Sequence, residues 1–487
     1  MTDEVSPERQ NRLPDGEGIP GLLAECVETA RAAAASLHPR RLVVGLLAIL
    51  AITQIGGLHD RLAGPRFGPV GLFADDPAGD LEASVERWRD RLGAAVRDGT
   101  LGEREPFDVA AATPWELLEE ARARCAVSFD ESGDRRADAE SAERRSQILS
   151  SALRSDRPLG TFEAVSIECA ASFGRFCRAV VVIEPRTAAE ALGTLLIAVP
   201  SAVWRHDRLF PITVVLPASI ICGLLGGMVS RMAACRFARR QWLTLGESAD
   251  FMGASWRRLV VAPLLPLAAS LVPLGLVALL GLLLAVPVLD VVAGVLFGVS
   301  LGLGLVAGIL LVGLAVGWPL IVPAIACEEA DAADCVQRAY AEPFNRFGRY
   351  LVLLVASLLG LAVAVAVLDA VLLATFWAVG LAVAGTAPEW VGAVLSGRAW
   401  LEFGAIPATS PNVAGWSVDA VATWITLARM LIGALAFAWF FDAGVRIHLF
   451  LRRAVDRVRP EEIAEAPGAL PRAERIREAI EAARRSR

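Results

Sequence analysis

Ionisable side chains inside long apolar segments are the best candidates for chemistry in this chain. Asp442 and Arg446 lie four residues apart in one apolar segment, so they can pair on one face of a helix, and His448 follows near its end. Asp369 lies in another apolar segment. Charges within a membrane are costly and often mark proton or ion pathways. A relay through Asp442 and Asp369 is one interpretation. We favour the other, a self-neutralised pair plus an interfacial Asp369, because two acids without further polar partners make a poor pathway.

The sequence carries no active-site motif in the structural context that it needs. The chain has no lysine and therefore no phosphate-binding loop. A GxGxxG run at 16–21 and a GxSxG run at 298–302 follow no predicted strand, so neither indicates a dinucleotide site or a serine nucleophile. Its eight cysteines form no CxxC pair, which argues against a metal or redox site. Four histidines are scattered along the chain, at His38, His59, His206 and His448. We therefore expect no catalytic residue, no metal and no cofactor, and we predict that the protein is not an enzyme.

Composition indicates an integral membrane protein. Of 487 residues, 55% are hydrophobic and only 21% are charged, and the mean hydropathy is +0.51. A soluble chain has about 45–50% apolar and about 25% charged residues. The excess lies in long apolar blocks, which excludes a freely soluble enzyme and a disordered chain. The net charge of −6 gives no reason to expect a nucleic-acid partner.

The predicted fold is all-α: a polytopic membrane helical bundle of about six transmembrane helices with a helical extracytoplasmic domain. A helix needs roughly 20 apolar residues to cross the hydrocarbon layer. The first predicted segment is short, and the fifth is too long for one straight crossing, so it tilts or continues along the interface. The six segments are 42–58, 209–229, 259–286, 291–316, 350–384 and 421–451.

Arginine clusters predict the orientation of these segments. Positive residues favour the cytoplasmic side, and clusters follow the second and sixth segments and precede the first, third and fifth. Both termini are therefore expected in the cytoplasm, with the protein in the bacterial inner membrane and its first helix an uncleaved anchor. The resulting regions are a cytoplasmic segment 1–41, a first helix 42–58, an extracytoplasmic domain 59–207, a five-helix bundle 208–452 and a cytoplasmic tail 453–487. The arginines expected to bind lipid headgroups are Arg239, Arg240, Arg257 and Arg258.

The extracytoplasmic region 59–207 is predicted to be helical. Helix starts are indicated at 113–116 and 187–190, and 188–204 is too short an apolar segment to span, so we expect it along the membrane surface. Cys125 could pair with Cys169 or Cys177, and free thiols are equally open. An apolar stripe of helical spacing is formed by Phe162, Val165, Cys169, Phe173, Phe176 and Val180.

Three amphipathic stretches lead through an arginine cluster into a membrane segment. They begin near residues 23, 246 and 331, and each predicts a short inner-surface helix that turns into a membrane helix. The second also has a degenerate likeness to the coupling loop of ABC-type importers, which would dock a separate ATPase. Prolines in the third membrane segment predict an ordinary kink there, or else a broken helix of the transporter kind; they are Pro263, Pro266 and Pro273.

A glycine ladder runs through the fourth membrane segment. Small residues at this spacing let helix backbones approach closely. Two alternatives stay open, packing inside this bundle and a seam with another molecule. The ladder consists of Gly294, Gly298, Gly302, Gly304, Gly308, Gly313 and Gly317.

Five short elements resemble a group of uncharacterised polytopic bacterial membrane proteins. These are GGMVSRMAA at 226–234, LGESA at 245–249, GWPL at 317–320, DCVQRAY at 334–340 and LFLRRAVD at 449–456. That group is similar in layout to the membrane domain fused to some glycerophosphodiester phosphodiesterases. The resemblance covers roughly residues 205–460. It implies the six-helix layout and brings no activity, catalytic residue or cofactor.

Abundant packing surface without recognisable chemistry predicts a structural or accessory subunit of a larger bacterial membrane complex. Its partners would be membrane lipids and either other proteins or further copies of the chain. The alternative is a permease or transport component that uses an intramembrane acid, and it requires a polar cavity reaching Asp442. A membrane enzyme acting on lipids ranks last, because it needs a convergent acid–base cluster.

Overall fold

The predicted all-α fold is confirmed. The computed structural model describes residues 19–97, 158–239, 241–284, 289–328, 331–383 and 416–457. Among these described residues, the only β-type pairing is one isolated antiparallel bridge between Phe67 and Leu159. The protein is thus a multi-pass helical membrane protein by length and composition of its helices.

The described residues contain seven helices long and apolar enough to cross a membrane, one more than the six expected. The addition is Pro185–His206, which was expected to lie along the surface. It is longer than predicted because α8 (Pro185–Gly193) begins earlier and continues through the π-helical turn η2 (Thr194–Ala198) into α9 (Val199–His206). The sequence count therefore missed one candidate span, because it treated this segment as only 188–204.

Contacts divide the chain into two units. Of the described residues, unit 1 contains 19–48, 219–361 and 434–457, and unit 2 contains the rest. The divisions fall inside four long helices: α3 (Pro39–Ala63), α10 (Leu216–Arg239), α15 (Phe347–Val383) and α17 (Trp416–Asp456). Each unit has its own buried apolar core.

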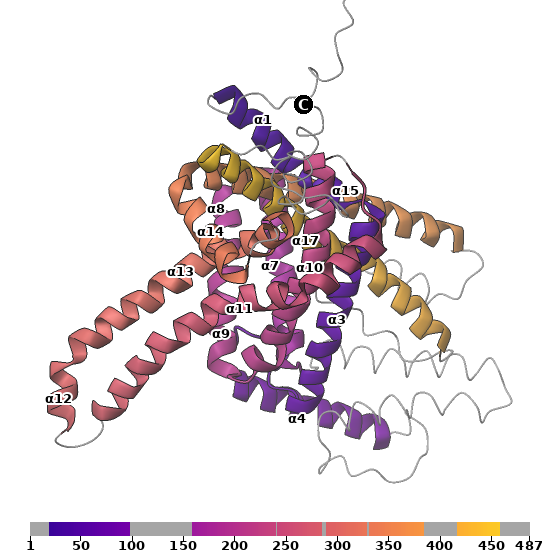
Figure 1. The fold of residues 1–487 in the computed structure, drawn as a ribbon. Coiled ribbons are helices and arrows are strands. Elements are labelled where there is room, and N and C mark those ends of the chain that lie inside the picture. The colour runs from indigo at the N-terminus through magenta and orange to yellow at the C-terminus, as the bar shows by residue number, and fades with distance from the viewer. Residues whose placement is uncertain are drawn as a thin grey trace, which may run out of the picture. The chain divides into compact units, whose positions relative to one another are not determined.

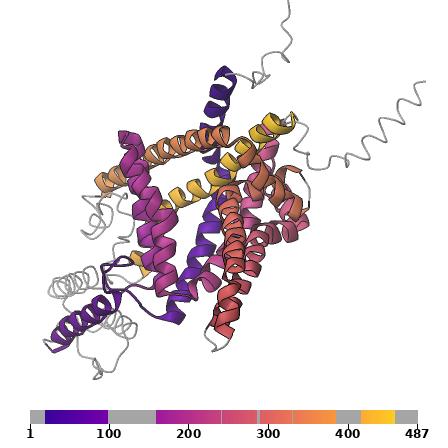
Figure 2. The same cartoon turned by 90° about the vertical axis from the view of Figure 1, so that its left-hand side faces the viewer.

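Unit 1 holds a long helical hairpin. The helices α11 (Leu245–Leu284) and α13 (Phe297–Glu328) lie side by side, and α12 (Leu289–Val295) stands between them in the chain (Figures 1 and 2). The amphipathic stretch near residue 246 is part of α11 and forms no separate surface helix. The other two stretches do form separate helices, since α1 (Ile19–Ala30) and α2 (Ala32–Ser36) precede α3, and α14 (Ala332–Asn345) precedes α15.

Unit 2 is built around α7 (Thr161–Val182), which lies beside α8 and α9 (Figure 2). The unit also holds α4 (Pro77–Arg97) and the π-helical turn η3 (Pro211–Val215). The stripe predicted for 162–180 does fall on one helix. Of the six stripe residues, Phe176 is fully buried and the others are half-buried. The helix start at 113–116 and Cys125 lie outside the described residues.

At three helix crossings in unit 1, a glycine of one helix lies against a backbone carbonyl of the other helix. A proline in that other helix leaves the carbonyl without a hydrogen-bond donor from its own helix. Proline lacks an N–H group, so it cannot bond the carbonyl four residues earlier. Three internal prolines stand four residues after such a contacted carbonyl: Pro263 after Leu259, Pro323 after Pro319, and Pro343 after Ala339. At each carbonyl a Cβ on the facing glycine would overlap the oxygen; the glycines are Gly223, Gly444 and Gly317 respectively. Only glycine permits this close approach of the backbone, which shields the carbonyl.

Replacement of Gly444 by alanine tests this arrangement. The new Cβ must push α17 away from the Pro319 carbonyl and the Pro323 ring. We expect the free energy of unfolding in mild detergent to fall by about 1–3 kcal/mol. Gly253→Ala on α11 is the matched control, because a Cβ there meets nothing within 4 Å. It should leave the stability unchanged or raise it by up to about 1 kcal/mol through helix propensity. Equal stabilities of the two variants would contradict the packing role.

Candidate functional site

The Asp442 cluster, defined as Glu28, Arg41, Asp442 and Arg446, is a buried charge network in unit 1. The last two residues are one turn apart on α17, and Arg446 Nε donates to Asp442 Oδ1 at 2.8 Å. Arg41 of α3 bonds the other carboxylate oxygen of Asp442. Arg446 also donates to the backbone carbonyl of Glu28 at 2.7 Å, so it links α17 to α1. Both oxygens of Asp442 are therefore bonded by guanidinium groups, and its side chain is 1% exposed.

A second acid on α1 strengthens the same assembly. Glu25 contacts Arg349 of α15 through both carboxylate oxygens, with Oε2 at 3.0 Å from the guanidinium Nε. Burial raises the pKa of Glu25. The hydrogen bond and the positive charge of Arg349 lower this pKa, but by less than burial raises it. The short helix α1 is thus joined by polar contacts to both α15 and α17.

The His448 cluster lies on another side of α17, and sequence analysis did not assemble it. It consists of Glu328 of α13, Arg338 and Glu342 of α14, and His448 and Arg452 of α17. His448 is fully buried, with Nδ1 at 2.9 Å from Glu342 Oε2 and Nε2 at 3.2 Å from Glu328 Oε1. Arg452 Nε lies 2.9 Å from Glu328 Oε1, and Arg338 contacts the other oxygen of Glu328.

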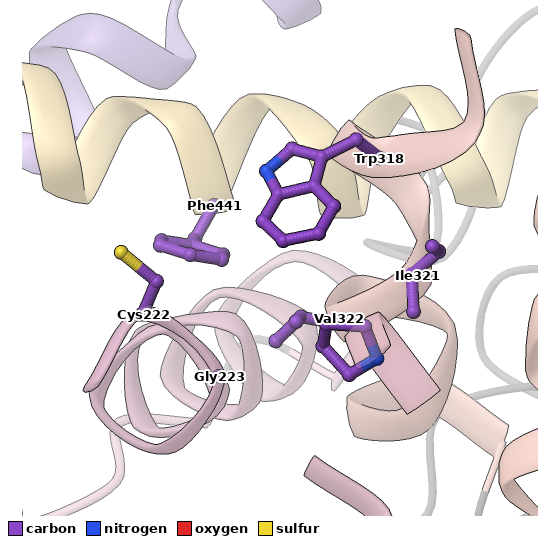
Figure 3. A pocket seen from close by; sticks show the side chains of 7 residues that line it. Cys222, Gly223, Trp318, Ile321, Val322 and Phe441 are labelled. Atoms are coloured by element: carbon purple, nitrogen blue, oxygen red, sulfur yellow. The ribbon is translucent and has the colours of Figure 1, made fainter. Parts of the chain in front are cut away.

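A small apolar pocket, with about 10 Å³ of space open to a water-sized sphere, lies in unit 1. Figure 3 shows the Trp318 and Phe441 rings at its edge, with Cys222, Gly223, Ile321 and Val322 around it. None of its lining residues carries a charge. Small-molecule sites usually measure about 300–1,000 Å³ and hold a few polar groups, so this pocket is a poor site for a polar solute.

Unit 2 contains the Asp207 cluster, formed by His59, Arg66, Thr161, Asp207 and Thr213. Asp207 Oδ2 lies 3.0 Å from both His59 Nε2 and Thr161 Oγ1, and Oδ1 accepts the backbone N–H groups of Leu209 and Phe210. Burial alone would raise the pKa of Asp207. The hydrogen bonds from His59 and Thr161, with the Arg66 charge, outweigh burial and lower it.

Thr213, His59 and Asp207 are hydrogen-bonded in a row, as are the nucleophile, base and acid of a catalytic triad. Thr213 Oγ1 lies 2.8 Å from His59 Nδ1, but it also bonds the Leu209 carbonyl at 3.0 Å. That second bond fixes the hydroxyl against the turn that precedes η3, which suits a structural hydrogen-bond hub. Nearby, both oxygens of Asp60 accept the first N–H groups of α7, from Phe162 and Glu163, so α3 caps this helix.

The glycine ladder divides into two parts. An added Cβ would meet nothing within 4 Å at Gly294, Gly298, Gly302, Gly304 and Gly308. Gly313 and Gly317 instead face Tyr340 and Ala339 of α14. The chain has two tyrosines, and both donate to carbonyls of α13, Tyr340 to Leu310 and Tyr350 to Val316.

The remaining predicted residues are dispersed. Asp369 lies in the unit 2 part of α15, and its Oδ1 is buried without a hydrogen-bond partner among the described residues. Arg257 is exposed and stacks on Trp256, while Arg258 bonds Ser255. The side chains of Arg239 and Arg240 lie outside the described residues. The long-range partners Arg41, His59 and Asp207 were missed, because no local spacing in the sequence connects them.

Comparisons with known proteins place the chain in no family. No family model, curated protein or solved structure matches it. The class of protein that the fold defines is therefore a polytopic helical membrane protein, and the resemblance stated above stays a prediction.

The Asp442–Arg41 pair can be tested by a double-mutant cycle. Removal of one buried partner leaves the other charge uncompensated, so Asp442→Asn or Arg41→Met should each lower the free energy of unfolding by about 3–5 kcal/mol. The combined Arg41→Met and Asp442→Asn variant should lose clearly less than the sum of the two single changes. Arg186→Gln, in an exposed pair with Glu190, is the control and should leave stability unchanged. Additive losses would exclude the coupling.

The Asp207 cluster predicts a specific acid dependence of stability. Its carboxyl pKa lies below the ordinary value of 3.8 in the folded protein. The carboxylate therefore contributes its full stabilisation above about pH 3.8, and this is lost as the pH falls through the lower folded-state pKa. Thermal unfolding of the wild type and of Asp207→Asn should differ at pH 7 and converge at strongly acidic pH. A constant difference across this range would refute the proposed role of the carboxylate.

Proposed function

We propose that the protein is a structural or accessory subunit of a larger complex in the bacterial inner membrane. The observation that carries this proposal is the open glycine face of the α12–α13 segment. At Gly298 and Gly302 no atom of the described residues lies within 4 Å of where a Cβ would stand, and the intervening Leu301 and the following Leu305 are about two-thirds exposed. A helix backbone can approach such a face closely, whereas lipid chains gain little from small residues at this spacing.

The expected occupant of this face is a membrane helix of a different subunit. Side chains of α14 already cover the ladder at Gly313 and Gly317, so the same device works within the chain at one end of α13. The open end is apolar and carries no charge between residues 297 and 327, which suits a helix rather than a polar domain.

The geometry gives less support to a permease. Asp442 is bonded by two arginines and is 1% exposed, so it is not available to a solute. The pocket in the same unit is small and lined without charges. A transport function would require a polar cavity that reaches this acid.

We further propose that both termini lie in the cytoplasm and that residues 59–207 are extracytoplasmic. The arginine clusters support this orientation, which requires an even number of crossings. Pro185–His206 is then the helix that does not cross. Its mean hydropathy of 1.4 is the lowest among the seven candidate spans of the described chain.

The test is the mass of the intact particle extracted from native membrane in mild detergent, with identification of its subunits. We expect unrelated subunits in fixed stoichiometry. Gly298→Leu with Gly302→Leu should release them, because the added side chains fill the space of the partner helix. Gly380→Leu on α15 is the control, since its Cβ position is equally open, and it should leave the particle intact. A lone monomer or a homodimer in the wild type would overturn the proposal.

A further inference from the structure

Buried polar atoms without hydrogen-bond partners gather in the His448 cluster. Five such atoms of the described chain belong to it: Glu328 Oε1 and Oε2, Glu342 Oε1, His448 Nε2 and Arg452 Nε. They lie within ion-pair distance of opposite charges but lack the alignment of hydrogen bonds. Such groups are rare in folded proteins and call for a physical explanation.

The two ring nitrogens of His448 face carboxylates on two different helices. Nδ1 is hydrogen-bonded to Glu342 of α14, and Nε2 lies 3.2 Å from the Glu328 carboxylate of α13. A neutral imidazole has one N–H group and one lone pair. Whichever nitrogen kept the lone pair would hold it beside a carboxylate oxygen, which is repulsive. With a proton on both nitrogens, both contacts become attractive.

The other charges near His448 are matched in number. Glu328 and Glu342 face two arginines, Arg338 and Arg452. At the edge of the cluster Asp456 pairs with Arg452, and Arg231 on the neighbouring α10 bonds the Ala326 carbonyl. The thiols of Cys327 and Cys335 also lie near Glu342. The two carboxylates that face the ring nitrogens are therefore the groups that favour a doubly protonated ring.

We infer that the His448 cluster is a proton-binding site, in which one bound proton completes the contacts that join α13, α14 and α17. Arg452 is 17% and Arg338 39% exposed in their side chains, so the cluster reaches the surface and the proton can exchange with water. Release of the proton turns one attractive contact of the imidazole into a repulsive one. The site is independent of the glycine face proposed to bind a partner.

The test is ¹⁵N nuclear magnetic resonance of the histidine rings in the full-length protein in mild detergent at pH 7. The chain has only four histidines, so His448 can be assigned by replacing the other three in turn. We expect its two nitrogens each to carry a proton in the wild type. In the isosteric Glu342→Gln variant the second proton should be lost and the remaining one should sit on Nε2, facing Glu328. In Glu328→Gln it should sit on Nδ1, facing Glu342.

Glu86→Gln on α4, an exposed position, is the control and should leave the His448 signals unchanged. A singly protonated His448 in the wild type would overturn the inference without recourse to any variant. The same tautomer in both glutamine variants would also overturn it, because the proton position would then not depend on the two carboxylates.

Discussion

A backbone carbonyl that loses its helical donor cannot be left facing lipid, and this constraint organises unit 1. Prolines in α11, α13 and α14 create such carbonyls, and at three of them a glycine of another helix closes over the oxygen. An uncovered carbonyl in hydrocarbon costs several kcal/mol. Proline on one helix and glycine on the next therefore act as a pair that fixes where helices cross.

The charged side chains of α17 also determine which helices lie beside it. This helix carries Asp442 and Arg446 towards α1 and α3, and His448 and Arg452 towards α13 and α14. Each charge costs free energy in an apolar interior unless an opposite charge meets it. The two clusters thus dictate the neighbours of α17 on two sides, and apolar packing fills the space between them.

Local patterns in the sequence predicted more of the fold than of the candidate site. The apolar blocks predicted α15 and α17 because helix formation depends on neighbouring residues, and the start of α11 has a Thr244–Glu247 capping box that is equally local. Asp442 and Arg446 were paired for the same reason. Their partner Arg41 is 401 residues from Asp442, and the His59–Asp207 contact spans 148 residues. Such pairs arise from helix packing, which no single-sequence spacing encodes. The seventh candidate span was missed because η2 lets two short helices run on as one.

The Arg41–Asp442 contact has a consequence for biogenesis, because it joins α3 to a helix that is synthesised 401 residues later. During translation Arg41 stays without this partner until α17 emerges, whereas Asp442 has Arg446 beside it on its own helix from the start. The contact between α3 and α17 therefore forms late, and a product that ends before α17 lacks it.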